Sequence, residues 1–174
     1  MNGLCAAAAA CRAGFRAGLG RRRLTGLGRR RANKSAIDEL QRQVELCRNA
    51  WSAAGKTGAP AVPIIRETFV AKTRKEAVEK ARPCLEQLYR AIYVKWKQNE
   101  AMSDPGELSW AFDKLARGRF ILGSPEECLD QIKEYESRLG VSYMLPRFDW
   151  TPGLAQEEIL ASMRLFGEKV IQRL

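Results

Sequence analysis

The stretch that most constrains the fold of this chain is residues 119–149, RFILGSPEECLDQIKEYESRLGVSYMLPRFD. It opens with an apolar run at 120–122 that is closed by a glycine, as at the end of a short strand. Ser124 is followed by proline and, three positions after the serine, by glutamate, which is typical of a capped helix start. Apolar residues recur at helical spacing as far as Gly140, which favours a left-handed helix end, and residues 141–145 predict a second, mostly buried strand. The stretch therefore predicts a strand–helix–strand unit with a right-handed parallel crossover.

Apolar spacing extends the same alternation to both sides of this unit. Thr73 with a glutamate three residues later predicts another capped helix, and Pro83 predicts a kink or a restart within it. Tyr89, Tyr93 and Trp96 lie on neighbouring turns of this helix, and aromatic clusters at such spacing usually belong to a core. The residues of the last helix expected to face inward are Ile159, Met163, Phe166 and Val170. The other predicted elements are a helix between Ser35 and Gly55, a strand at 64–71, a short helix at 107–116 and the last helix at 155–173.

The positive charge of the chain is confined to its first 34 residues. Lys and Arg number 30 and Asp and Glu 20, which makes the net charge +10. Nine of the bases and none of the acids precede Ser35, so the rest of the chain holds 21 bases against 20 acids. This near neutrality gives no reason to expect a nucleic-acid surface on the folded part. No apolar run approaches the roughly 20 residues of a membrane helix, so we expect no membrane partner.

The basic leader, residues 1–34, has three competing interpretations. Its arginine-rich, acid-free composition resembles an organelle transit peptide. Residues 21–26, RRRLTG, resemble a twin-arginine signal, although no apolar segment follows them. The third interpretation is that the leader is not a native coding sequence, because Ala, Gly and Arg dominate when GC-rich DNA is translated in an unintended frame. In each case we expect disorder, since the leader cannot bury enough apolar surface to offset the entropy of ordering.

Histidine and cysteine usage excludes several kinds of site. The chain has no histidine, so a Ser–His–Asp triad, a histidine-bearing metal site and imidazole acid–base catalysis are excluded within it. The cysteines show no CxxC spacing and their number is odd; they are Cys5, Cys11, Cys47, Cys84 and Cys128. We therefore expect neither disulfides nor a metal site, and a reducing, cytoplasmic location.

Two places carry polar residues that are unusual beside buried strands. Arg66 and Glu67 interrupt the first apolar strand. Charged side chains there are costly unless they pair with a neighbouring element, lie exposed at a strand end or line a pocket, and the sequence leaves these alternatives open. The second place is the loop after the last strand, which contains Arg147, Asp149 and Trp150.

Five segments occur in an order and spacing that are typical of one enzyme family. They are DELQRQVELCRNAWSAAGK, VPIIRETFVAKTRKEA, RFILGSPEECLDQIKEY, YMLPRFDWTPGL and EEILASMRLFGEKVI. Over roughly residues 32–174 the chain thereby resembles the C-terminal half of the bacterial luciferase-like monooxygenase family. Each segment is common by itself, and it is their combination that carries the resemblance.

The resemblance implies an α/β fold in which residues 35–174 form the last three strand–helix units of a TIM barrel. It also implies a flavin-dependent oxidoreductase or monooxygenase that binds reduced FMN or a deazaflavin and a small-molecule substrate at the C-terminal ends of the strands. The candidate cofactor-binding or substrate-pocket residues are Arg66, Glu67, Gly123, Ser124, Arg147, Asp149 and Trp150. No catalytic residue is assigned, and without histidine any proton transfer would fall to carboxylates or tyrosines.

These candidates have different expected roles. An arginine would pair with an anionic group of the flavin or substrate, and Trp150 would lie against an aromatic ring. The turn at Gly123 and Ser124 presents N–H groups at a helix N-terminus, where an anion can bind.

Most of a barrel is not accounted for by this resemblance. A TIM barrel needs about 250 residues, and the family builds much of its flavin pocket on earlier strands, which residues 1–34 do not match. We therefore expect a truncated chain that is not competent alone. The alternative is a non-catalytic fragment that associates with another barrel subunit, or forms a homo-oligomer, through its open sheet edge. A third hypothesis, an RNA-binding protein with a basic tail, depends on the leader alone.

Overall fold

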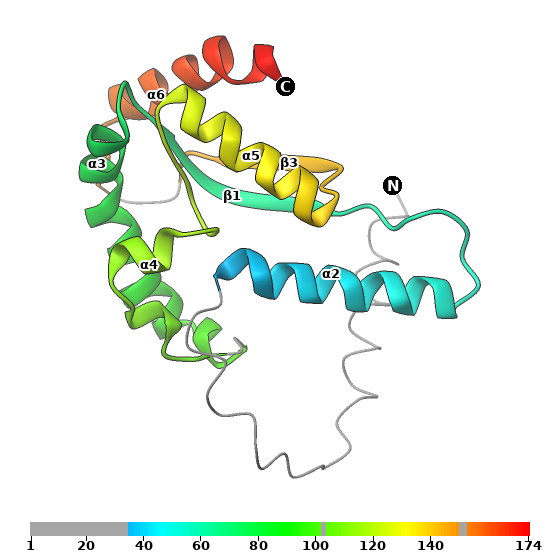
Figure 1. Cartoon of the computed structure of the whole chain (residues 1–174). Helices are drawn as coiled ribbons and strands as arrows, with labels where there is room; N and C mark the ends of the chain where they lie inside the picture. Colours follow the sequence, from blue (N-terminus) through cyan, green and yellow to red (C-terminus); the bar gives the residue numbers. More distant parts are fainter. Residues whose placement is uncertain (1–34, 102–103, 150–152) are drawn as a thin grey trace.

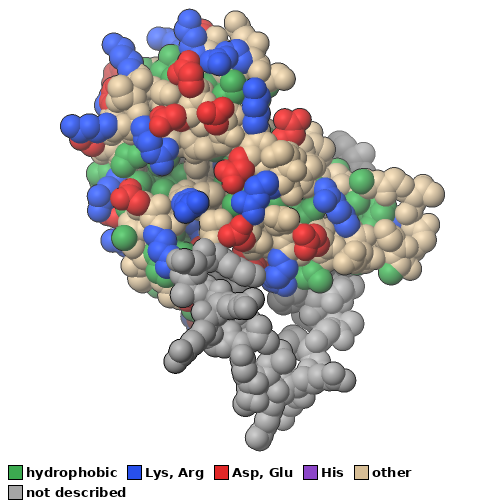
Figure 2. Space-filling view, in the orientation of Figure 1, with side chains coloured by type: hydrophobic (Ala, Val, Ile, Leu, Met, Phe, Trp, Pro, Cys, Tyr) green, Lys and Arg blue, Asp and Glu red, His purple; other side chains and the backbone are tan. Residues whose placement is uncertain are grey.

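The computed structural model describes residues 35–101, 104–149 and 153–174, which form helices around a short sheet (Figure 1). The expectations for the leader lie outside these described residues. Within the described ranges, no helix is both long and apolar enough to cross a membrane. On the face shown in Figure 2, acidic and basic side chains are intermixed, as expected from the near neutrality of the chain after residue 34.

The observed elements follow the predicted alternation of helices and strands. The strands of the described residues are β1 (Pro63–Val70), β2 (Ile121–Gly123) and β3 (Tyr143–Arg147). The α-helices are α2 (Ala36–Ala53), α3 (Arg74–Gln87), α4 (Phe112–Ala116), α5 (Pro125–Leu139) and α6 (Gln156–Lys169). A π-helical segment, η1 (Leu88–Tyr93), extends α3, and short 3-10 turns form η2 (Gln98–Ala101), η3 (Glu107–Ser109) and η4 (Ile171–Arg173).

Helix starts and stops coincide with their capping residues. The Ser124 hydroxyl accepts the N–H of Glu127 at 3.3 Å, and the Glu127 carboxylate accepts the N–H of Ser124 at 2.9 Å. This confirms the predicted capping box at the start of α5, and Gly140 ends the helix with a left-handed φ of 63°. Thr73 and Ser35 stand at the starts of α3 and α2, as predicted.

The helix after Thr73 changes its geometry later than the sequence suggested. Regular α-helix runs through Pro83 and ends at Gln87, so the helix does not restart at the proline. Ala81 and Leu85, on either side of the proline, are buried and keep this part of α3 packed in the core. The π-helical turn η1 follows directly and carries Tyr89 and Tyr93. Such wide turns are frequent at functional sites.

β1 is the middle strand of the sheet and pairs in parallel with both other strands (Figure 1). Its residues 68–70 pair with β2 on one edge, and its residues 63–67 pair with β3 on the other. The strands before and after α5 are therefore parallel, as expected, but β1 separates them. The expected α/β class with a parallel sheet is confirmed.

β3 is an edge strand and is less buried than predicted. It spans Tyr143–Arg147 rather than 141–145, and Tyr143 and Leu145 are 63% and 46% exposed. Ile65, the register partner of Leu145 on β1, is 57% exposed. The prediction of a mostly buried strand is wrong because this part of the sheet face is open to solvent in the described structure.

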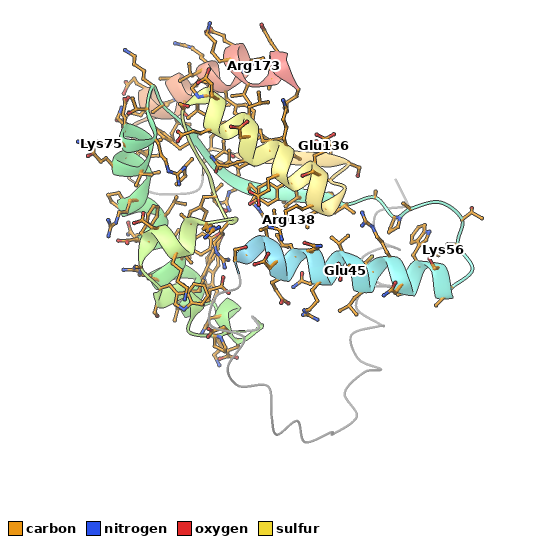
Figure 3. The ribbon with its side chains drawn as sticks, viewed as in Figure 1. Glu45, Lys56, Lys75, Glu136, Arg138 and Arg173 are labelled. Carbon is orange, nitrogen blue, oxygen red and sulfur yellow. The ribbon has the colours of Figure 1, made fainter. Side chains whose placement is uncertain are left out.

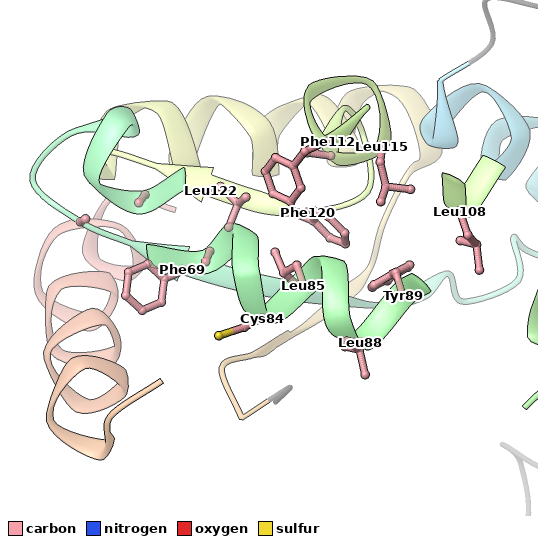
Figure 4. Packing of buried hydrophobic residues seen from close by; sticks show 14 residues of the cluster. Phe69, Cys84, Leu85, Leu88, Tyr89, Leu108, Phe112, Leu115, Phe120 and Leu122 are labelled. Atoms are coloured by element: carbon pink, nitrogen blue, oxygen red, sulfur yellow. The ribbon is translucent and has the colours of Figure 1, made fainter. Parts of the chain in front are cut away.

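Two apolar clusters lie on opposite faces of the sheet. Phe69 and Leu122 belong to a cluster with α3 and α4, whereas Val70 and Ile121 belong to a cluster with α5 and α6. Successive strand residues point to opposite faces, so α3 covers one face and α5 the other. Figure 4 shows the first cluster, in which Leu85 of α3 lies among the strand side chains.

Arg138, near the end of α5, connects this helix to α2 (Figure 3). Its Nη2 donates to Asp38 Oδ1 at 2.6 Å and to Gln41 Oε1 at 3.0 Å. Arg48 of α2 also donates to the Leu139 carbonyl at 2.8 Å. These long-range contacts attach α2 to the layer formed by α5, since the helix buries few of its own apolar residues.

α6 meets the sheet through a residue that the apolar spacing did not predict. Met163, expected to face inward, is about half exposed, whereas the neighbouring Ser162 is buried. Ser162 Oγ accepts the N–H of Val70 at 2.7 Å, on the edge of β1 that β3 leaves uncovered. The expectation for Met163 is wrong because the adjacent Ser162 faces the sheet instead, where it gives the buried Val70 N–H the partner that such a donor needs.

We predict that Ser162→Ala destabilises the fold by roughly 1–3 kcal/mol, because it leaves the Val70 N–H buried without an acceptor. Chemical denaturation measures the loss, and the amide of Val70 should exchange with solvent faster in the variant. The matched control is Ser137→Ala on α5, an exposed position whose change should stay within about 0.5 kcal/mol. Equal stability of the two variants would contradict the role assigned to Ser162.

Candidate functional site

The two charged residues of β1 point to opposite faces of the sheet. Arg66 faces α5, where its Nε donates to the Tyr135 hydroxyl at 3.0 Å and its guanidinium lies 5.0 Å from the ring centroid. Glu67, the next residue, faces the side of α3. Its register partner on β3 is Arg147, the last residue of that strand. Glu67 and Arg147 therefore lie side by side at the end of β3, and they are the first two members of a polar site.

Glu67 is buried beneath the helical segment η1. The Tyr89 hydroxyl donates to Glu67 Oε2 at 3.0 Å, and both side chains are buried. Burial, with the Glu67 charge as a second cause, raises the pKa of Tyr89 far above its usual range. Tyr89 therefore keeps its proton and acts as a fixed donor to the carboxylate.

Tyr93 connects this buried pair to the solvent-facing end of the site. Arg147 Nη1 donates to the Tyr93 hydroxyl at a long 3.4 Å. Burial raises the pKa of Tyr93, followed by the effect of the Glu67 charge, so this hydroxyl also keeps its proton. On its other side Arg147 Nε lies 3.6 Å from Asp149 Oδ1, and Asp149 is almost fully exposed. Among the described residues, the side-chain contacts of Arg147 are therefore long and partly solvated.

A second ion pair supports the buried end of the site. Arg119, just before β2, pairs with Glu107 of η3, and both side chains are mostly buried. The Arg119 guanidinium lies 5.6 Å from the centroid of the Tyr89 ring. Its Nε is buried and has no hydrogen-bond partner among the described residues. The positive charge of Arg119 opposes the effect of Glu67 on the pKa of Tyr89.

The aromatic residues expected to form a core do so only in part. Tyr89 is buried, and its ring centroid lies 4.7 Å from that of Tyr93. Trp96, by contrast, is 62% exposed. Helical spacing was a correct sign that the three rings are neighbours, but it could not tell which of them the rest of the fold covers.

The remaining predicted site residues do not join this cluster. Ser124 and Gly123 lie at the start of α5, where the Ser124 N–H is already bonded to the Glu127 carboxylate. A Cβ on Gly123 would approach the Glu127 side chain to 2.7 Å, so the helix's own carboxylate fills this turn. Trp150 lies outside the described residues.

The arrangement can bind an anion and hold protons, and other chemistries find less support. No group of three or more His, Cys, Asp or Glu residues in the described part of the chain could hold a metal ion. Burial raises the pKa of the Cys128 thiol to about 12, which makes it a poor nucleophile. The groups of this cluster that could take part in binding or catalysis are the buried Glu67 carboxylate with its Tyr89 donor, and the weakly held guanidinium of Arg147.

A hollow of about 270 Å³ lies away from this cluster, between the start of α2, the end of α4 and α5. It is lined by Asp38, Glu134, Arg138 and Arg117, among others. Arg138 binds both acidic residues, and its hydrogen bond lowers the pKa of Asp38. The charges of this hollow therefore mainly hold helices together.

Sequence reasoning missed Tyr89, Tyr93, Arg119 and Glu107 as site residues. The spacing of the two tyrosines was visible, and their proximity to charged strand residues would have followed from knowing which sheet face the helix covers. Nothing local distinguishes Arg119, because its neighbours come from η3 and η1, which are distant in the chain.

Comparison with known proteins identifies a family that this chain matches. Residues 31–142 match the model of the family described as luciferase-like monooxygenase. A search of curated proteins finds no match.

Similar solved structures include two monooxygenases. Monooxygenase RslO1 from Streptomyces bottropensis has a TM-score of 0.61 at 20% identity, covering 82% of this chain and 40% of that one. The second is the oxygenating constituent of 3,6-diketocamphane monooxygenase from Pseudomonas putida, a type II Baeyer–Villiger monooxygenase in complex with FMN. It has a TM-score of 0.60 at 19% identity, covering 81% of this chain and 41% of that one.

This likeness shows the fold, and the parallel sheet with its helices is consistent with part of a TIM barrel. The chain spans only 40% and 41% of the length of the two structures. Because the family model matches more than half of the chain, this protein belongs to the luciferase-like monooxygenase family.

Proposed function

We propose that this chain contributes one wall of the active site of a flavin-dependent monooxygenase, or more broadly a flavin-dependent oxidoreductase. The observation that carries the proposal is the convergence of Glu67 and Arg147, register partners on parallel strands, with Tyr89 and Tyr93. Chemistry in parallel barrels lies at the C-terminal ends of the strands, and β3 ends at Arg147. Family membership supports the reaction class.

The residues at this site fit part of a flavin. Arg147 is partly exposed and loosely held, so its guanidinium is available to a phosphate or to a ring carbonyl. Reduced FMN or a deazaflavin would supply the redox chemistry when bound. Tyr89 and Tyr93 retain their protons, which leaves Glu67 as the group of this cluster best suited to accept and return one.

The described residues supply this wall and not a whole pocket, since the chain spans 40% of the similar monooxygenase RslO1. We therefore propose that the chain alone binds flavin weakly and does not turn over. A small-molecule substrate would bind with the cofactor at the same strand ends.

Flavin titration of the purified chain tests this proposal, with FMN and a deazaflavin followed by flavin fluorescence. Arg147→Gln should weaken flavin binding about tenfold, as expected for a lost charge-assisted hydrogen bond. The matched control is Arg66→Gln, because Arg66 sits on the opposite face against Tyr135 and should leave binding unchanged.

Equal effects of the two arginine variants, or no flavin binding at millimolar concentration, would refute the assignment of the site. A tight stoichiometric complex would refute the proposal that the chain is not competent alone.

A second candidate function, association with another barrel subunit, is favoured by the open face of β1 and β3. Ile65, Tyr143 and Leu145 are all about half exposed or more, and register places Ile65 opposite Leu145. Contiguous exposed apolar side chains on a sheet favour association. In this alternative the chain is a non-catalytic partner.

If this alternative holds, the chain should sediment above its monomer mass of 19.6 kDa at micromolar concentration. Ile65→Glu should return it to the monomer, because a charge in the apolar face opposes its burial. Leu46→Glu on α2 is the control, since Leu46 is similarly exposed but lies on a different element. Sedimentation velocity measures all three proteins, and a monomeric wild type would exclude association of copies of the chain.

A further inference from the structure

Trp96 differs from the other tryptophans that the structure describes. A lysine ammonium lies over the ring of Trp51 at 4.3 Å and over the ring of Trp110 at 3.6 Å. No such cation lies over Trp96 among the described residues, and its side chain is 62% exposed. An exposed indole offers an apolar ring face and an N–H donor to a ligand.

The backbone around Trp96 is nevertheless ordered by hydrogen bonds. The Trp96 N–H donates to the Ile92 carbonyl at 3.0 Å, and the Lys97 N–H donates to the Val94 carbonyl at 2.9 Å. Lys97 then takes a left-handed φ of 57°, which is unusual for a residue other than glycine. The helical segment therefore stops immediately after presenting the tryptophan.

Tyr93 links this indole to the charged end of the site. The ring centroids of Tyr93 and Trp96 are 6.1 Å apart and their planes differ by 30°. The hydroxyl of the same tyrosine accepts the Arg147 N–H at 3.4 Å. Two aromatic faces and one guanidinium are thus contiguous at the end of β3.

Arg147 can exchange its present counter-ion, Asp149, for a ligand. Its contact with Asp149 is 3.6 Å long, and the aspartate is almost fully exposed. Solvent-exposed pairs of this kind contribute little to stability. An incoming carboxylate or phosphate that binds the guanidinium bidentately would replace Asp149 at little cost.

We propose that Trp96, Tyr93 and Arg147 form a subsite for a planar aromatic ring that carries an anionic group. The ring lies against Trp96 and Tyr93, and the anionic group binds Arg147. The inference rests on the proposed function and deepens it by naming the chemistry of the ligand. Two sources share that chemistry: the flavin mononucleotide itself, and an aromatic acid bound beside the cofactor.

Equilibrium dialysis of the full chain against small probes tests the subsite. We expect 2-naphthoate to bind about tenfold more tightly than 2-naphthalenemethanol, which lacks the charge, and than cyclohexanecarboxylate, which lacks the aromatic ring. Trp96→Ala and Arg147→Gln should each weaken naphthoate binding about tenfold, and Trp96→Phe should restore most of it. Trp51→Ala, on α2, is the matched control and should have no effect.

Competition separates the two sources. If FMN displaces naphthoate and binds about tenfold more tightly than riboflavin, the subsite holds the cofactor. If FMN and naphthoate bind together, it holds an aromatic acid beside the cofactor.

The inference is overturned if no probe binds, or if naphthoate binding is indifferent to Trp96→Ala. Flavin binding that responds to Arg147→Gln but not to Trp96→Ala would overturn the subsite and leave the proposed function standing. Naphthoate binding without any flavin binding would refute the proposed function and leave the subsite standing.

Discussion

The structure depends on β1, the strand that is paired on both edges and packed on both faces. Its alternating side chains enter two separate apolar clusters, Phe69 with α3 and Val70 with α5 and α6. This arrangement buries the C-terminal half of the strand almost completely. Glu67 lies in this buried half, where a charge needs a partner, and the Tyr89 hydroxyl supplies it.

Backbone groups along the edge of β1 that faces β3 are hydrogen-bonded in three different ways. Residues 63–67 pair with β3 itself. Beside this pairing, the Thr68 hydroxyl donates to the Arg66 carbonyl at 3.0 Å. Beyond the end of β3, Ser162 of α6 accepts the N–H of Val70. The short β3 is what leaves room for a polar cluster at its end.

The site could be predicted from sequence in part, and the limit is physical. Arg66, Glu67 and Arg147 were recognisable because charges beside apolar strands are costly. The sequence could not show that Arg66 faces Tyr135 and is structural, whereas Glu67 faces Tyr89 and belongs to the site. A shift of one residue in a strand moves every side chain to the opposite face of the sheet. Spacing likewise predicted that Tyr89, Tyr93 and Trp96 are neighbours, but not that Trp96 stays exposed.

The sequence by itself determined where α2, α3 and α5 begin, the α/β alternation and the family, because caps and apolar periods act over a few residues. Only the tertiary structure decided the strand order, the open face of β3 and the membership of the polar cluster. Those depend on pairing between segments about 80 residues apart, such as the Val62 N–H with the Ser142 hydroxyl. No local pattern specifies which edge of β1 a distant strand will take, and the chemistry of Glu67 and Arg147 follows from that choice.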